Sequence, residues 1–397
     1  MNKIIAAMFA AVVCLAVAGC ALAASPASVI EPNTGVKVIS AADWQNTYPD
    51  VYASYMANAD NKDVTDYVAD YPMIATVYEG MAFNTYYSSA RGHYYCVEDV
   101  SETGRPHKLA NCFTCKTADF TYMANEQGVS AYKLAFEDVL PQIKESVGCY
   151  TCHADDPAKG ITVTHTYLAD AMGDDLSKVA AQTAACAQCH VEYYFDPETK
   201  ATTLPYQDLA SMNPDQIYDF YEGMDFADYT NPRTGVRQLK AQHSEFETYM
   251  GAGSVHAGTF TCADCHMEKA VNADGKTYVS HAWVSPLNSE TIQKTCAACH
   301  SDLQAFVKGI QDKTEERTIA IGNKLEELTN KLADAVASGK YAEEQLDAIR
   351  ALNRKGQWYW DFVFVENSEG AHNSRLDGSC LDKADALITE ALGMFGD

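Results

Sequence analysis

Five pairs of cysteines in this 397-residue sequence are each separated by two residues, a spacing that suits attachment of a metal or a porphyrin. A histidine follows four of the pairs directly, and a lysine follows the first. The motifs are Cys112, Cys115 and Lys116 in C-F-T-C-K; Cys149, Cys152 and His153 in C-Y-T-C-H; Cys186, Cys189 and His190 in C-A-Q-C-H; Cys262, Cys265 and His266 in C-A-D-C-H; and Cys296, Cys299 and His300 in C-A-A-C-H. C-x-x-C-H is the attachment signature of c-type haem. Zinc ribbons also use C-x-x-C pairs, but they do not need a histidine after each one. We therefore expect five covalently attached c-type haems.

The lysine of the first motif indicates a haem with a different task. A haem that only transfers electrons is served by two strong axial ligands, whereas a haem that performs chemistry needs an open axial position. Lysine binds iron only as the neutral amine, so Lys116 would have to be shielded from water. The alternative is that Lys116 is solvated and that this haem takes its ligands from elsewhere.

The histidines outside the motifs are enough to supply the remaining axial ligands. The sequence has 11 histidines, of which four lie in the motifs. The other seven are His93, His107, His165, His243, His256, His281 and His372. Four histidine-anchored haems would take four of these as second ligands.

The N-terminus predicts export. One early lysine is followed by a small and apolar run and then by a polar stretch, as in a secretory signal peptide. We expect a signal peptide over residues 1–19 with lipidation at Cys20; cleavage after Ala23 is the alternative. Haem is attached to c-type cytochromes outside the cytoplasm, so the location is the periplasm or the outer face of the cytoplasmic membrane, with a lipid anchor at Cys20.

The formal net charge of -25 argues against binding to nucleic acid or to an anionic membrane surface through basic residues. An anionic substrate would therefore need a local basic site.

Two cysteines, Cys96 and Cys380, lie outside the motifs and the signal peptide. We expect them to form either a disulfide or two separate buried thiols.

The elements that must position the motifs are short, except near the C-terminus. We expect a tether over residues 20–40, a pentahaem catalytic body over 41–300 and a helical C-terminal segment of the same domain over 301–397. Two hairpins are predicted, from 191–195 into 201–204 and from 271 into 277–279. Leu325, Leu328, Leu332 and Val336 recur at helical spacing, a second helix includes 346–362, and a third covers 380–395. These apolar residues form a stripe along the helices. We expect the stripe to pack in the core, with a subunit interface as the alternative. The fold class is a mainly α multihaem cytochrome with short helices and loops around five haems, one or two short β-hairpins and long C-terminal helices.

From about Tyr71 onward the sequence strongly resembles cytochrome c nitrite reductases, which are pentahaem enzymes that form ammonium. The resemblance is carried by R-G-H-Y-Y-C-V-E-D-V-S-E-T-G-R ending at Arg105, the C-F-T-C-K motif, C-A-Q-C-H-V-E-Y-Y-F, L-K-A-Q-H ending at His243, the segment 262–281 and G-Q-W-Y-W-D at 356–361. It implies six-electron reduction of nitrite to ammonium at a lysine-ligated haem fed by four bis-histidine haems. Alternatives are a multihaem electron carrier, or a related reductase acting mainly on hydroxylamine or sulfur oxyanions.

Carried over residue by residue, the resemblance makes Lys116 the ligand of the active-site iron and Arg105, Tyr193 and His243 the catalytic residues. The second ligands implied are His281 for the haem on Cys149 and Cys152, His93 for that on Cys186 and Cys189, His372 for that on Cys262 and Cys265, and His256 for that on Cys296 and Cys299. His107 and His165 are then expected at the surface.

The resemblance also implies a calcium ion and partners, and the sequence departs from the family in two places. Calcium would be held by the Glu192 carboxylate, the Tyr193 and Lys240 carbonyls and the Gln242 side-chain oxygen, which are all hard donors.

The electron donor implied is a membrane-bound quinol-oxidising multihaem cytochrome, and a homodimer would form through the C-terminal helices. The stretch from Arg105 to Cys112 is shorter than in the best-known members, so we expect a different rim to the active-site channel. The C-terminal segment after His372 is also shorter than in many relatives.

Overall fold

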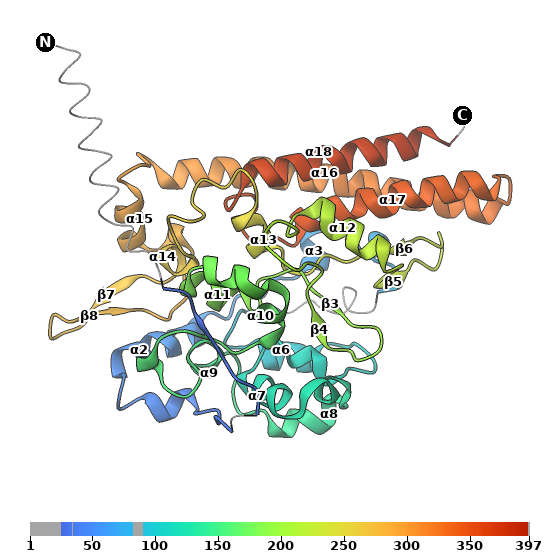
Figure 1. Ribbon diagram of the computed structural model, residues 1–397. Coiled ribbons are helices and arrows are strands. Elements are labelled where there is room, and N and C mark those ends of the chain that lie inside the picture. The colour runs from blue at the N-terminus through green and yellow to red at the C-terminus, as the bar shows by residue number, and fades with distance from the viewer. Residues whose placement is uncertain (1–24, 34, 82–89, 396–397) are drawn as a thin grey trace, which may run out of the picture.

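The computed structural model describes residues 25–33, 35–81 and 90–395, and it is mainly helical (Figure 1). The predicted signal peptide, Cys20 and the alternative cleavage site lie outside the described residues. Within the described residues, no helix has the length and apolar character needed to cross a membrane.

The cysteine motifs lie in a body of short helices joined by loops (Figure 1). The α-helices are α2 Pro49–Met56, α3 Tyr67–Asp70, α4 Ile74–Val77, α6 Cys96–Glu102, α7 Ala118–Gln127, α8 Phe136–Val139, α9 Tyr150–His153, α10 Thr166–Met172, α11 Ala181–Ala187, α12 Pro214–Gly223, α13 Glu245–Met250, α14 Cys262–His266 and α15 Glu290–Cys296. The 3-10 helices are η1 Ala41–Trp44, η2 Ala57–Asp60, η3 Ala110–Phe113, η4 Gly128–Lys133, η5 Leu140–Gln142, η6 Pro157–Lys159, η7 Gly173–Lys178 and η8 Pro286–Asn288.

The described strands form four two-stranded sheets. They pair β1 Ser28–Val29 with β2 Thr162–Val163 in parallel, and β3 Tyr194–Phe195 with β4 Thr202–Thr203, β5 Tyr229–Thr230 with β6 Arg237–Gln238 and β7 Lys269–Val271 with β8 Thr277–Val279 in antiparallel register. The β3–β4 and β7–β8 hairpins confirm the two predicted ones. Residues 28–30 of the expected tether contact the body, because β1 pairs with β2 and Ile30 is buried.

The predicted C-terminal helices are present as α16 Leu303–Ser338, α17 Glu343–Phe364 and α18 Ser374–Gly393, which lie side by side along one edge of the molecule (Figure 1). Asp302 caps the start of α16 by accepting a hydrogen bond from the Ala305 amide, and Gly339 ends it with φ 61°. Leu325, Leu328 and Leu332 are fully buried, so the apolar stripe forms core.

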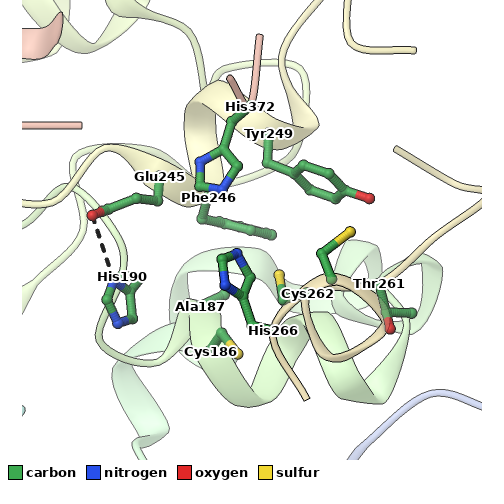
Figure 2. A pocket seen from close by; sticks show the side chains of 11 residues that line it. Cys186, Ala187, His190, Glu245, Phe246, Tyr249, Thr261, Cys262, His266 and His372 are labelled. Atoms are coloured by element: carbon green, nitrogen blue, oxygen red, sulfur yellow. Dashed lines mark ion pairs between the residues drawn. The ribbon is translucent and has the colours of Figure 1, made fainter. Parts of the chain in front are cut away.

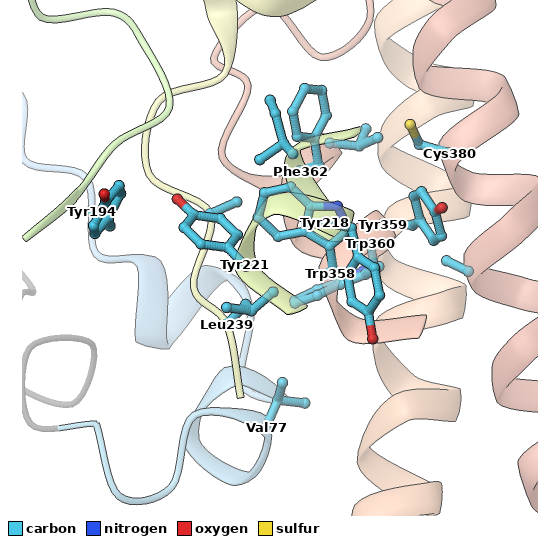
Figure 3. Close-up of a cluster of buried hydrophobic side chains, with 14 of the residues drawn as sticks. Val77, Tyr194, Tyr218, Tyr221, Leu239, Trp358, Tyr359, Trp360, Phe362 and Cys380 are labelled. Atoms are coloured by element: carbon cyan, nitrogen blue, oxygen red, sulfur yellow. The ribbon is translucent and has the colours of Figure 1, made fainter. Parts of the chain in front are cut away.

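The aromatic residues of α17 attach this bundle to the body (Figure 3). Trp358 Nε1 donates to the Pro214 carbonyl of α12 at 2.9 Å, and Trp360 Nε1 donates to the Thr318 carbonyl of α16 at 2.8 Å. Both indoles are fully buried and both N–H groups are satisfied, so α17 has a fixed orientation between α12 and α16.

Two of the residues to which the sequence motifs assign no role are buried. His165 is only 4% exposed, so the expectation that it lies at the surface is wrong; its ring is held by polar groups from distant segments. His107 is exposed, as expected. Cys96 in α6 and Cys380 in α18 are both free thiols rather than a disulfide, and Cys380 is buried.

Candidate haem and catalytic centre

Four pairs of histidine rings face each other across the body. The distances between ring centroids are 5.8 Å for His93 and His190, 6.2 Å for His153 and His281, 6.1 Å for His266 and His372, and 6.1 Å for His256 and His300. A metal bound about 2.0 Å from one nitrogen of each of two imidazoles would hold the ring centres about 6 Å apart. These are the same four pairs that the resemblance implied. The spacing of their rings fits haem iron bound between them, and ligation itself stays a prediction.

Five of these imidazoles are oriented by a second contact through Nδ1. Carbonyl oxygens lie near Nδ1 of His153 (Gly160, 3.0 Å), His266 (Val284, 3.1 Å) and His281 (Val279, 3.0 Å). Carboxylates lie near Nδ1 of His190 (Glu245, 3.5 Å) and His372 (Glu366, 2.5 Å). Histidine ligands of metals characteristically donate their other ring N–H in this way. The arrangement leaves Nε2 of each ring available to bind iron.

Burial also favours the neutral imidazole at His93. Desolvation, assisted by the nearby His190 and His243, lowers the pKa of His93 to about 4. A neutral imidazole is the form that binds a metal.

A pocket lined mainly by apolar atoms separates His266 from His372 (Figure 2). The thiols of Cys262 and Cys265 and the rings of Phe246 and Tyr249 also line it. Paired axial ligands, two attachment thiols and flanking aromatic rings are the surroundings that a covalently bound porphyrin needs. The residues present therefore fit haem at this motif.

The five motifs form a connected series in space. The Cys115 thiol lies close to that of Cys189, and the Cys186 thiol lies close to that of Cys262. Cys265 and Cys296 are close enough to interact electrostatically. Cys152 also interacts electrostatically with Cys189. The second motif is therefore connected to the series through the third motif. Groups attached here would have near neighbours for electron transfer.

The lysine motif lies against the candidate catalytic residues Tyr193 and Arg105. The Tyr193 hydroxyl interacts electrostatically with Cys112, Cys115 and Arg105, and burial raises its pKa well above the usual value. Arg105 and Lys116 are half-buried. The structure thus brings a cation and a phenol to the first motif.

Cys96 contacts the backbone of this motif. Its Sγ lies 3.1 Å from the Lys116 carbonyl oxygen and 3.1 Å from that of His93. A thiol carries one proton and donates to one of these at a time. The position of Cys96 next to Lys116 gives this residue a packing role that its sequence context did not reveal.

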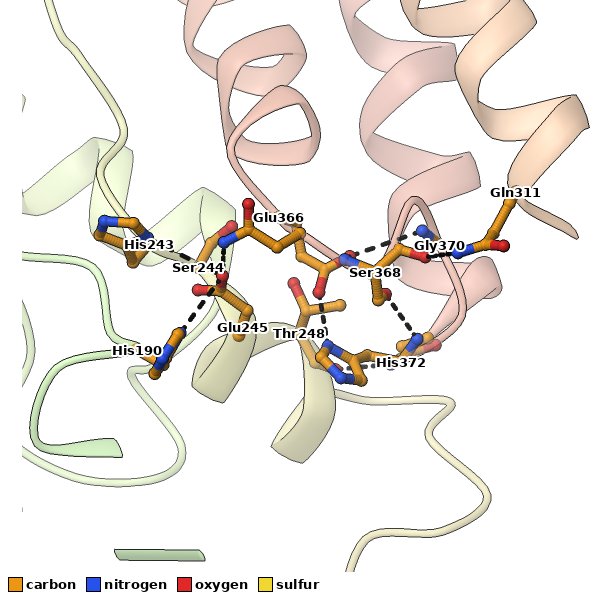
Figure 4. Close-up of polar contacts among 12 residues, drawn as sticks. His190, His243, Ser244, Glu245, Thr248, Gln311, Glu366, Ser368, Gly370 and His372 are labelled. Atoms are coloured by element: carbon orange, nitrogen blue, oxygen red, sulfur yellow. Dashed lines mark hydrogen bonds and ion pairs between the residues drawn. The ribbon is translucent and has the colours of Figure 1, made fainter. Parts of the chain in front are cut away.

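His243 lies beside the third motif (Figure 4). Its ring centroid is 5.9 Å from that of His190, and its Nδ1 is 3.8 Å from Glu245 Oε1. Burial alone would raise the pKa of Glu245, but the two imidazoles hold it well below its usual range. Glu245 is therefore a buried carboxylate shared by His190 and His243. The His243 side chain is 47% exposed, so it can exchange protons with solvent.

The donors expected for calcium converge next to Tyr193 and His243. The buried Glu192 accepts hydrogen bonds from the Tyr221 hydroxyl at 2.8 Å and the Gln242 amide at 2.6 Å. The Gln242 side-chain amide lies 2.9 Å from the Lys240 carbonyl oxygen. The Lys240 ammonium is engaged separately, 2.8 Å from Asp361.

Further carboxylates surround these donors. Burial raises the pKa of Glu247 to about 8 and that of Asp228 to about 7. Glu247 accepts the Glu192 amide at 3.0 Å, and Asp228 accepts the Lys240 amide at 2.8 Å. Buried carboxylates are costly unless a cation compensates them. The all-oxygen donor set and the surrounding carboxyl groups fit calcium.

Sequence reasoning missed Glu245 and Glu366, which orient His190 and His372. Glu245 stands two residues after His243 and Glu366 six residues before His372, but nothing in either spacing indicates which histidine each contacts. The acidic residue shortly before His372 was the only available signal.

A family model described as cytochrome c552 matches residues 40–392. The chain is similar to the solved structure of cytochrome c nitrite reductase from Desulfovibrio desulfuricans ATCC 27774, described as the catalytic subunit NrfA with two calcium sites: the sequence identity is 25%, the TM-score is 0.78, and the match covers 91% of this chain and 87% of that chain. The outer cell wall cytochrome OcwA matches at 20% identity with a TM-score of 0.41, over 75% of this chain and 48% of that chain, which is too low to support an argument.

Proposed function

The chain belongs to the cytochrome c552 family, and from this premise we propose that it reduces nitrite to ammonium. The observation that carries the proposal is the combination of one lysine motif with four facing histidine pairs in a fold similar to a solved cytochrome c nitrite reductase. An electron carrier would have no use for an arginine and a tyrosine gathered at the motif that differs.

The thiols of the five motifs would hold five haems, with Lys116 and the four histidine pairs as axial ligands. When bound, these haems would supply an open iron position for nitrite at the first motif and a route for electrons through the others. Lys116 would contribute its neutral amine.

Reduction of nitrite to ammonium consumes six electrons and eight protons and releases two waters, so the site must supply protons repeatedly. Arg105 provides a permanent positive charge that binds the nitrite oxygens and stabilises the negative charge that develops on them. His243 delivers protons, because imidazole exchanges protons near neutral pH and this one reaches solvent. Glu245 keeps the His243 ring oriented, and Tyr193 positions the substrate by a hydrogen bond.

Calcium would fix the geometry of two of these residues, since Glu192 precedes Tyr193 and Gln242 precedes His243. We expect chelation of calcium to lower nitrite turnover and the melting temperature, and added calcium to restore both. In Glu192→Gln the melting temperature should no longer respond to calcium, because a carboxylate ligand is lost. Calorimetry with and without calcium measures this effect.

Glu198→Gln is the matched control, because Glu198 is an exposed residue in the neighbouring β3–β4 connection. An unchanged response to calcium in the Glu192 variant would contradict the site. A lost response in Glu198→Gln would show that the effect is not specific to Glu192.

Export would place the protein in the periplasm or, with a lipid on Cys20, on the outer face of the cytoplasmic membrane. We propose a membrane-bound quinol-oxidising multihaem cytochrome as the electron donor. A homodimer would use the exposed N-terminal half of α16 together with its neighbouring helices.

The function is tested on the intact, haem-loaded protein. Its denatured mass should exceed that of the polypeptide by five haems, and reduced dye with nitrite should yield ammonium. Hydroxylamine and sulfite are supplied in parallel, and ammonium and sulfide are quantified. Fewer than five haems would contradict the motif assignment, while sulfide formation much faster than ammonium formation would favour a sulfur oxyanion reductase.

A further inference from the structure

A buried polar cluster connects three of the five motifs. It contains the inner motif residues Thr114, Thr151 and Gln188 together with Thr164 and His165 from the segment before α10. These side chains are between 0% and 5% exposed. None of them is an attachment thiol or an expected iron ligand, so the proposed catalytic chemistry leaves the cluster without a role.

Gln188 joins the third motif to the second. Its Oε1 accepts hydrogen bonds from the amides of Thr164 at 2.6 Å and His165 at 3.0 Å. Its Nε2 donates to the carbonyls of Thr151 at 3.1 Å and Ala185 at 3.1 Å. Backbone amides only donate and carbonyls only accept, so these partners fix the orientation of the Gln188 amide. The Thr164 hydroxyl adds a bond to the Thr151 carbonyl at 2.7 Å.

His165 joins the first motif to the third. Its Nε2 lies 2.9 Å from the Thr114 carbonyl oxygen and 3.2 Å from the Thr121 hydroxyl. Because a carbonyl only accepts, Nε2 carries a proton and donates it. The His165 backbone amide donates to Gln188 Oε1 at 3.0 Å and so completes the connection to the third motif. Thr114 stands two residues before Lys116, so this bond holds the backbone from which the lysine extends.

The contacts are costly to break, because each lost bond leaves a buried polar group unsatisfied. Tyr167 reinforces the same junction: its hydroxyl donates to the Gln188 carbonyl and lies 3.7 Å from Cys115 Sγ. The three motifs are therefore tied together by the protein itself, in addition to any haem that they hold.

We propose that His165 is a positioning residue that, with Gln188 and Thr164, fixes the lysine motif relative to the second and third motifs. It thereby sets the placement of Lys116, Cys112 and Cys115 and of the neighbouring attachment sites. The inference deepens the proposed function and rests on it for the kinetic measurement alone, because displacing a catalytic group slightly lowers the rate without abolishing binding.

The test compares His165→Phe, which removes both ring nitrogens, with His165→Gln, which keeps a donor toward the Thr114 carbonyl. We expect His165→Phe to retain five haems by mass, to alter the high-spin iron signal in electron paramagnetic resonance, and to lower kcat about tenfold with KM for nitrite changed less than about twofold. His165→Gln should recover the wild-type signal and most of kcat. Wild-type spectra and kcat in His165→Phe would overturn the proposal, as would a His165→Gln protein as perturbed as His165→Phe.

Thr164→Val provides a nearly isosteric second test that spares the first motif. It removes the bond to Thr151, so it should shift a low-spin signal or midpoint potential while leaving the high-spin signal intact. Thr277→Val in the exposed strand β8 is the control and should change neither. If His165→Phe does not accumulate, unaltered low-spin signals and potentials in Thr164→Val overturn the proposal. The spectra decide it even if the wild-type protein forms no ammonium.

Discussion

Lys116→Ala is expected to lower nitrite turnover by about a thousandfold or more. The variant loses the proposed ligand of the iron at which we propose that nitrite binds, while Cys112 and Cys115 remain for attachment. Its mass should still show five haems, and electron paramagnetic resonance should show a changed high-spin signal beside unchanged low-spin ones. Ammonium production with reduced dye measures the loss.

Lys116→His separates the identity of the ligand from its presence. It creates an ordinary C-x-x-C-H motif, so the iron should regain a strong axial ligand and turnover should lie between those of the wild type and Lys116→Ala. Lys133→Ala, at an exposed lysine of η4, is the control for loss of a positive charge. A Lys116→Ala protein with wild-type rates and high-spin signal would show that the lysine is not the ligand.

The long C-terminal helices could be predicted from sequence because their apolar residues repeat at helical spacing over many turns. Leu325, Leu328 and Leu332 form one buried face, and Gly339 marks its end. The two predicted hairpins were also recognisable from their turn residues. The β5–β6 hairpin was not predicted, although Pro232 and Gly235 lie in its turn.

The candidate site was less accessible to pattern reasoning, because its contacts join segments that are distant in sequence. The motifs themselves are local signals, but the partner of each motif histidine came only from the resemblance. His165 was assigned to the surface as an isolated polar residue; its partners Thr114 and Gln188 belong to two different motifs. Glu245 was overlooked for the same reason, since it contacts a histidine of the third motif.

The polar groups around His243 distinguish a catalytic role from a structural one. Glu245 lies 3.5 Å from His190 and 3.8 Å from His243, so a single buried carboxylate contacts both an expected iron ligand and the expected proton donor. His190 has a partner ring in His93, and its own Nδ1 is turned toward Glu245. His243 is the more exposed of the two imidazoles beside this carboxylate. We therefore propose ligation by His190 and proton delivery by His243.

His243→Asn is accordingly expected to lower kcat for nitrite by about 10²–10⁴-fold, the range associated with loss of a general acid. Asparagine keeps a polar side chain of similar reach but cannot release a proton, so five haems, the high-spin signal and the melting temperature should be retained. His107→Asn is the matched control, because His107 is exposed and its φ of 55° is one that asparagine adopts readily. Steady-state ammonium production separates the two variants. Full turnover in His243→Asn would remove this histidine from the mechanism, and a loss of haem from that variant would assign it to folding instead.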